Sequence, residues 1–117
     1  MTVETDEPGR AASDGRIRRG DRTRREVLRV AVDIASVEGL DGLSIGRLAT
    51  ELGLSKSGLI GHFGSKEELQ LATIRAARAI FARSVIEPAL EQPPGLAQVR
   101  ALIDAWLTYS SDRRFPG

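Results

Sequence analysis

The 117-residue sequence has no cysteine and only one histidine. Without cysteine, the chain cannot form a disulfide, a zinc–thiolate site or a catalytic thiolate, and a single imidazole cannot form a histidine metal cluster. No apolar run approaches the roughly 20 residues that a membrane-spanning helix needs, and the polar N-terminus is not a secretory signal. These absences favour a soluble cytoplasmic protein with a modest core and no contact with membranes.

Groups of residues suited to catalysis are missing as well. The chain shows no nucleophile with a neighbouring base, no cluster of metal ligands and no phosphate-binding loop. Within the expected helices, the adjacent carboxylate pair is Glu67-Glu68, and adjacent residues of a helix do not face each other. Because two glutamates also suit the positive start of a helix, helix capping explains them better. We therefore expect no enzymatic activity and no cofactor.

Positive charge is concentrated in the middle of the chain. Residues 1–15 carry a net charge of −3, residues 16–66 carry +4, and residues 67–117 are neutral. A basic region favours binding to phosphates, because their condensed counterions are released. Arginines that only solvate a helix surface would give the same charge, so this pattern needs support from a motif.

That motif lies between Ser44 and Phe63. A first apolar stripe with helical spacing ends at Gly53, a residue that tolerates the positive φ of a helix end. Ser44 and Ser55 stand where each of two short helices needs an N-cap. The second helix keeps only Leu59 and Phe63 as apolar anchors. Two helices joined by a glycine turn predict a helix-turn-helix, whose second helix enters the major groove of DNA.

Further helices are expected on both sides of this motif. Thr23 and Glu26 have the spacing of a capping box, followed by an apolar stripe that ends near Gly39. A second capping box, Ser65 with Glu68, starts a long helix that we expect to end near residue 86, because Pro88 follows. A last amphipathic helix is expected over residues 96–110. Residues 1–20 have too little apolar surface to fold, and we expect them to be disordered. Their basic end, Arg16–Gly20, is either a solvated tail or an arm that reaches a DNA minor groove.

Residues 23–69 resemble the DNA-binding domain of the TetR family of bacterial regulators. The resemblance rests on Glu38-Gly39 and on three longer blocks: S-I-G-R-L-A (44–49), G-L-S-K-S-G-L (53–59) and H-F-G-S-K-E-E-L (62–69). It implies an all-α protein, in which a three-helix, homeodomain-like helix-turn-helix domain precedes a long connecting helix and a helical regulatory domain. It also implies a homodimer on a palindromic operator of double-stranded DNA, and a small-molecule effector. Family members typically continue for several helices that supply most of the dimer interface and ligand pocket, so we expect a truncated or fragmentary regulator.

The resemblance also carries residue roles. Lys56 and Ser57 open the recognition helix, and Ile60 and Gly61 face outward one turn later. Phosphate contacts are implied for Ser44 and Arg47 before that helix and for His62 and Lys66 after it. The candidate DNA-binding residues are therefore Ser44, Arg47, Ser55, Lys56, Ser57, Gly58, Ile60, Gly61, His62 and Lys66.

The recognition helix departs from the family pattern at three positions. Many members carry an aromatic residue at the position of Ile60, and isoleucine replaces its hydrogen bond by apolar contact with a thymine methyl. Gly58 and Gly61 each cost roughly 1 kcal/mol relative to alanine in a helix. They allow the helix backbone to approach DNA closely, or reflect neutral drift, or mark a helix that orders on binding.

Three segments are thus expected: an arm (1–20), a helix-turn-helix domain (21–68) and an incomplete ligand-binding and dimerisation domain (69–117). The resemblance predicts a sequence-specific DNA-binding transcriptional regulator associated with the bacterial nucleoid, either a ligand-responsive repressor or a fragment of one. The alternative is a helical protein-interaction module that does not bind DNA.

Overall fold

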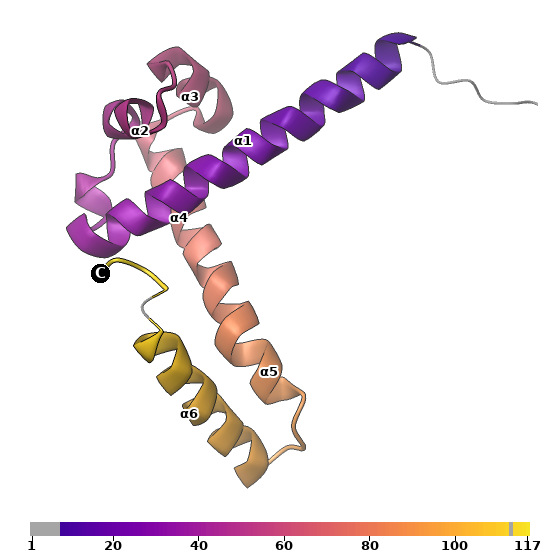
Figure 1. Ribbon diagram of the computed structural model, residues 1–117, viewed down its shortest axis with the longest axis vertical. Helices are drawn as coiled ribbons and strands as arrows, with labels where there is room; N and C mark the ends of the chain where they lie inside the picture. Colours follow the sequence, from indigo (N-terminus) through magenta and orange to yellow (C-terminus); the bar gives the residue numbers. More distant parts are fainter. Residues whose placement is uncertain (1–7, 113) are drawn as a thin grey trace, which may run out of the picture.

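The computed structural model describes residues 8–112 and 114–117, with side chains from residue 18 onward. All regular structure in this part of the chain is helical, which confirms the all-α prediction. The elements in chain order are α1 (Pro8–Glu38), η1 (Leu40–Gly42), α2 (Ile45–Leu52), α3 (Lys56–Phe63), α4 (Lys66–Phe81), η2 (Ala82–Ile86), α5 (Glu87–Leu90) and α6 (Leu96–Ser111). Helix α1 crosses the first half of α4, and α2 and α3 pack beside this crossing (Figure 1).

One hydrophobic core holds α1 to α4 together. Its buried members come from all four helices and from the turn before α2: Val27, Ala31, Leu43, Leu48, Ala49, Leu59, Phe63, Leu69 and Ala72. Burial of each large aliphatic side chain stabilises the fold by about 1.5–3 kcal/mol. The core therefore fixes the motif against α1 and α4, as the apolar stripes predict.

Helix α1 is longer than the sequence indicates. We expected it to start at a capping box on Thr23, and this expectation is wrong, because Thr23 lies inside a helix that begins at Pro8. Residues 8–20, expected to be disordered, are helical, while residues 1–7 lie outside the described part. The physical reason is cooperativity. Once residues 27–32 pack and nucleate the helix, each further turn needs no new nucleus.

Pro88 does not end the long helix. After α4 the chain continues without a break through η2, a π-helical segment, into α5, which has Pro88 in its first turn. The Glu87 N–H donates to the Ala82 carbonyl, five residues back. Because proline has no N–H and crowds the preceding turn, a wider π turn accommodates it where a regular α-helix would break.

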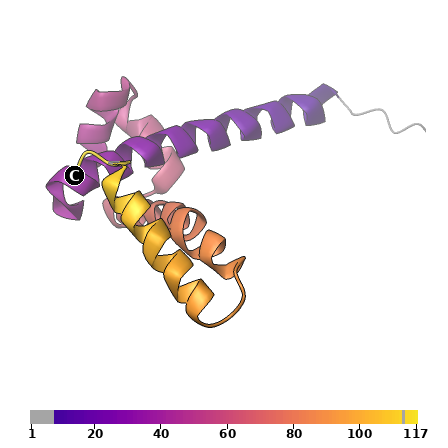
Figure 2. The same ribbon diagram turned by 60° about the horizontal axis from the view of Figure 1, so that its bottom comes forward.

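Helix α6 runs back alongside η2 and α5 (Figures 1 and 2). Val85 and Ala89 are buried in this helix pair, whereas the opposite face of α6 is exposed. The chain after α6 turns toward the end of α1, where the Gly117 N–H donates to Ser36 Oγ at 3.2 Å. Two edge-to-face aromatic contacts support this return, Phe81–Tyr109 and Tyr109–Phe115, with ring centroids 5.4 and 6.0 Å apart.

Candidate nucleic-acid interface

The turn between α2 and α3 has the geometry that the sequence predicts. Gly53 adopts φ 66° and ψ 30°, in the left-handed region. The Leu54 N–H then donates to the Ala49 carbonyl at 3.0 Å, which closes the end of α2 in the manner of a Schellman motif. A residue with a Cβ would be strained at this φ. The glycine therefore sets the angle at which α3 leaves α2.

Serine side chains cap the starts of α2, α3 and α4. Ser44 Oγ accepts from the Arg47 N–H at 3.0 Å, and Ser55 Oγ accepts from the Gly58 N–H at 3.0 Å. Ser65 Oγ accepts from the Glu68 N–H at 3.2 Å. All three predicted N-caps are confirmed. Each hydroxyl uses an acceptor lone pair here, so Ser44 keeps its O–H donor for a phosphate, whereas Ser55 Oγ shares a 3.4 Å hydrogen bond with Ser57 Oγ in which either hydroxyl can donate.

Helix α3 is held by two side chains and exposes the rest. Leu59 is 1% exposed and Phe63 is 5% exposed, and both belong to the core. His62 is half-buried on the side facing α1, and Lys66 is exposed at the first position of α4. The exposed residues of α3 and its cap are Ser55, Lys56, Ser57, Gly58, Ile60 and Gly61. The structure thus brings most of the predicted recognition residues onto one exposed element.

Arg24 of α1 fixes the last turn of α3, a role that the sequence reasoning missed. Its Nη1 donates to the His62 carbonyl at 2.9 Å. Its guanidinium carbon lies 4.6 Å from the centroid of the Phe63 ring, a cation–π contact. The carbonyls at a helix end lack partners within the helix and carry partial negative charge, so an arginine suits this place. Only the tertiary packing of α1 against α3 reveals the pair, because 38 residues separate its members.

Arg47 is engaged with carboxylates. It pairs with Glu38 at the end of α1, and its Nε lies 3.9 Å from Glu51 Oε1, one turn further along α2. The hydrogen bond to Glu38 raises the pKa of the Arg47 guanidinium, desolvation opposes this, and the charges of Glu38 and Glu51 add to the increase. The Arg47 side chain therefore links α2 to α1, and a phosphate contact would have to compete with two carboxylates.

Lys56 lies across the start of α2. A Cβ on Gly46 would lie 3.3 Å from Lys56 Cε and 3.6 Å from its Nζ. The absence of a side chain at Gly46 thus leaves the space that the lysine occupies. The ammonium group thus lies near the junction of the two helices and remains exposed. Sequence spacing alone did not predict this role for Gly46, because nothing distinguishes it from any other small residue in the S-I-G-R-L-A block.

The two glycines of α3 have different surroundings. A Cβ on Gly58 would lie 3.0 Å from the capping Ser55 Oγ, whereas a Cβ on Gly61 would meet nothing within 4 Å. The cap at Ser55 therefore gives a local structural reason for a glycine at position 58. Gly61 leaves bare backbone beside Ile60, which is 47% exposed. The helix is formed over Lys56–Phe63 in the chain alone, which does not favour the idea that it orders only on binding.

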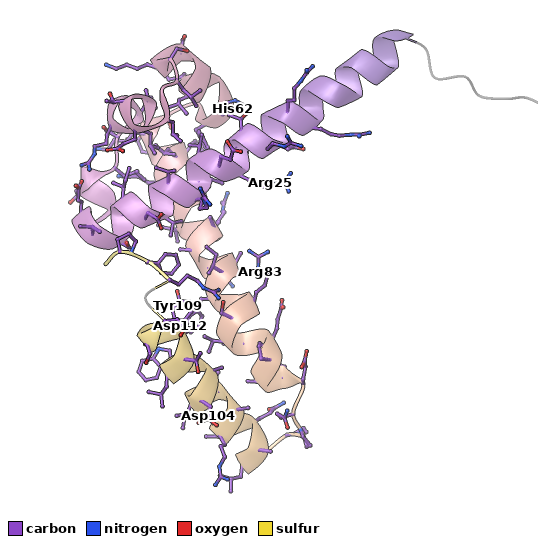
Figure 3. All side chains as sticks on the ribbon, viewed as in Figure 1. Arg25, His62, Arg83, Asp104, Tyr109 and Asp112 are labelled. Carbon is purple, nitrogen blue, oxygen red and sulfur yellow. The ribbon has the colours of Figure 1, made fainter. Side chains whose placement is uncertain are left out.

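The N-terminal half of α1 extends beyond α3 and away from the core (Figure 1). Arg25 lies on α1 near the level of His62 (Figure 3), and three further exposed arginines precede it: Arg18, Arg19 and Arg22. We expected either a minor-groove arm or a solvated tail here. The minor groove of B-DNA is about 6 Å wide and does not admit a helix about 10 Å across. A helical segment therefore does not favour the minor-groove interpretation for the described residues.

A comparison with known families identifies this architecture. Residues 27–73 match the family model of bacterial regulatory proteins of the TetR family. This match over residues 27–73 supports a TetR family regulator. The match covers the packed half of α1, the whole of α2 and α3, and half of α4, which is the part that shares one core. No curated protein sequence matches the chain.

The matched domain supports a DNA-binding transcription regulator of the TetR family. The family consists of regulators, and its helix-turn-helix domain is the part described above. Among the described residues, no group of three or more His, Asp or Glu side chains is placed to hold a metal ion. No described helix is both long enough and apolar enough to cross a membrane.

Proposed function

We propose that this TetR-family regulator represses transcription by placing α3 in the major groove of a palindromic operator. The observation that supports the proposal is the surface of α3, where Leu59 and Phe63 are buried and the remaining faces are exposed. Lys56 and Ser57 lie at the start of the helix, where a recognition helix meets base edges and the nearest phosphates. Ile60 offers apolar contact to a thymine methyl, and Gly61 permits close approach.

Backbone contacts flank this helix in the proposal. Ser44 offers an O–H donor, and so does Ser55 when Ser57 donates in their shared hydrogen bond. Lys66 with the free N–H groups at the start of α4 forms a site for one phosphate. His62 lies between α3 and α1 in Figure 3. The exposed arginines of α1 add long-range attraction to the duplex, since a helix along the backbone neutralises phosphates without entering a groove.

Regulation by a ligand is the second part of the proposal. A small molecule bound among α4, η2, α5 and α6 would shift α4, and α3 moves with it because Leu69 of α4 shares the core with Leu59. In a dimer, such a shift changes the distance between two recognition helices, so the ligand and the operator favour different conformations. A protein with this role acts in the bacterial cytoplasm at the nucleoid.

Fluorescence anisotropy with a labelled duplex, obtained by selection from a random pool, tests the DNA-binding part. Lys56→Ala should weaken binding about fivefold and reduce the slope of log affinity against log salt by about 1. Arg100→Ala on α6 removes the same charge from an exposed helix outside the motif and should leave both unchanged. Equal losses in the two variants, or no DNA affinity in a folded sample at low salt, would refute the proposal.

A protein-interaction module is the second candidate, and one observation favours it. The outer face of α6 exposes apolar side chains at helical spacing: Leu96, Val99, Ile103, Trp106 and Leu107, each at least 50% exposed. A continuous apolar stripe of this kind is typical of an interface. Size-exclusion chromatography with light scattering distinguishes the candidates, because a stable assembly without DNA affinity would support the module alone.

A further inference from the structure

A basic crevice lies at the junction of three parts of the chain. It has a volume of about 590 Å³ and lies between α1, the α4–η2 helix and the segment after α6. Arg29 comes from α1, Arg83 from η2 and Arg114 from the C-terminal segment. Figure 3 shows Arg83 on the long helix between the DNA-binding half and α6. Residues that are 31 to 85 positions apart in the sequence therefore meet around one space.

The three guanidiniums are not neutralised by neighbouring carboxylates. Asp33 is the one acidic residue that lines the crevice. Within the part of the chain that the structure describes, none of these arginines forms an ion pair. Arg114 Nη1 donates to Ser84 Oγ, which leaves most of its donors available. The lining thus carries three positive charges and one negative charge, and it would attract an anion with two charges.

Part of the wall of the crevice is apolar. Val32 is buried, and Ile80 and Phe115 are half-buried at its lining. A free inorganic anion would leave this wall in contact with water. A compound with a charged group and a small apolar body would cover it and gain about 25 cal/mol for each Å² of apolar surface removed from water.

We propose that this crevice binds a small organic dianion, a phosphate monoester or a dicarboxylate, whose apolar body packs on Val32, Ile80 and Phe115. Guanidinium groups bind phosphate and carboxylate oxygens through paired N–H donors, so three of them around one space suit either head group. The crevice is separate from α2 and α3, and binding does not depend on DNA recognition. The bound dianion would join α1 to η2 and to the C-terminal segment.

Isothermal titration calorimetry on the full chain tests the proposal with three aromatic probes. Phenyl phosphate and isophthalate should bind, and isophthalamide, the neutral counterpart of isophthalate, should not. Binding of only one of the two anions supports the site and assigns its head group. Isophthalamide binding as tightly as isophthalate, or no heat from either anion at millimolar concentration, would overturn the proposal.

Variants locate the site. Arg83→Gln should weaken the anion that binds by about tenfold, since it removes a charged hydrogen-bond donor. Arg75→Gln makes the same change on α4 at an exposed position that does not line the crevice, and it should have no effect. An equal loss in both variants would show nonspecific attraction and overturn the site. Circular dichroism checks that each variant is folded. If Arg83→Gln unfolds, Arg29→Gln replaces it in the titration, and the same loss of affinity is expected.

The apolar wall has its own test. Ile80→Ala should weaken phenyl phosphate about threefold, because part of the packed apolar surface is lost, and should leave inorganic phosphate unchanged. If inorganic phosphate binds the unaltered chain as tightly as phenyl phosphate does, the assignment of an organic ligand is wrong.

Discussion

Removal of the Arg24 side chain tests how α1 controls the recognition helix. In Arg24→Ala, the His62 carbonyl loses its 2.9 Å hydrogen bond and the Phe63 ring loses the cation above it. Both contacts are made at the last turn of α3, immediately before Gly64 leads the chain into α4. The variant should therefore destabilise the fold and also loosen the end of α3, the helix that we propose to meet DNA.

The structure allows an estimate of the size of this effect. A hydrogen bond from a charged donor contributes roughly 1.5–3 kcal/mol, and half-burial places this one near the lower limit. The cation–π contact adds about 0.5–1 kcal/mol, and the better helix propensity of alanine returns a few tenths of a kcal/mol. We expect a loss of about 2 kcal/mol in the free energy of unfolding. For a chain of this length, that loss lowers Tm by about 8 °C.

Urea denaturation followed by circular dichroism measures the loss, and anisotropy measures operator affinity. Arg25→Ala is the matched control, because Arg25 is exposed and reaches only the Asp21 carbonyl of its own helix at 3.4 Å. The control should change stability by less than about 0.5 kcal/mol. If the two variants lose stability equally, the contacts of Arg24 do not hold α3. Wild-type operator affinity in Arg24→Ala would show that the end of α3 does not need this support.

Three more predictions concern α2 and α3, and urea denaturation checks each. Gly61→Ala should stabilise the fold by about 1 kcal/mol through helix propensity. Gly58→Ala should stabilise it less, because the new Cβ would lie only 3.0 Å from Ser55 Oγ. Equal gains in stability would show that this contact is unimportant. Ser44→Ala should cost about 1 kcal/mol by removing the cap of α2, and an unchanged midpoint would contradict the capping role. Leu59→Ala should cost about 3 kcal/mol, because Leu59 is 1% exposed in the core; a loss below about 1 kcal/mol would mean that the site collapses around the cavity.

Some errors of prediction have a common cause. The start of α1 at Pro8 and the passage of the long helix through Pro88 both depend on helix cooperativity and on packing against distant segments. A local signal, such as the Thr23–Glu26 spacing or a proline, gives a propensity of about 1–3 kcal/mol. Tertiary packing outweighs a term of that size, so the local signal does not decide the boundary.

The sequence by itself determined the helix-turn-helix. The caps at Ser44, Ser55 and Ser65 and the left-handed turn at Gly53 depend on residues within four positions of each other, and such short-range geometry is encoded locally. Leu59 and Phe63 were identifiable as anchors because helical spacing places them on one face.

Only the tertiary structure decided which charged side chains are available at each surface. It pairs Arg47 with Glu38, directs Arg24 to the end of α3, and gathers Arg29 with two later arginines around one crevice. These partners are separated by 9 to 85 positions. Their approach depends on how whole helices pack, and the attraction between two charges is too weak and too screened in the unfolded chain to specify it.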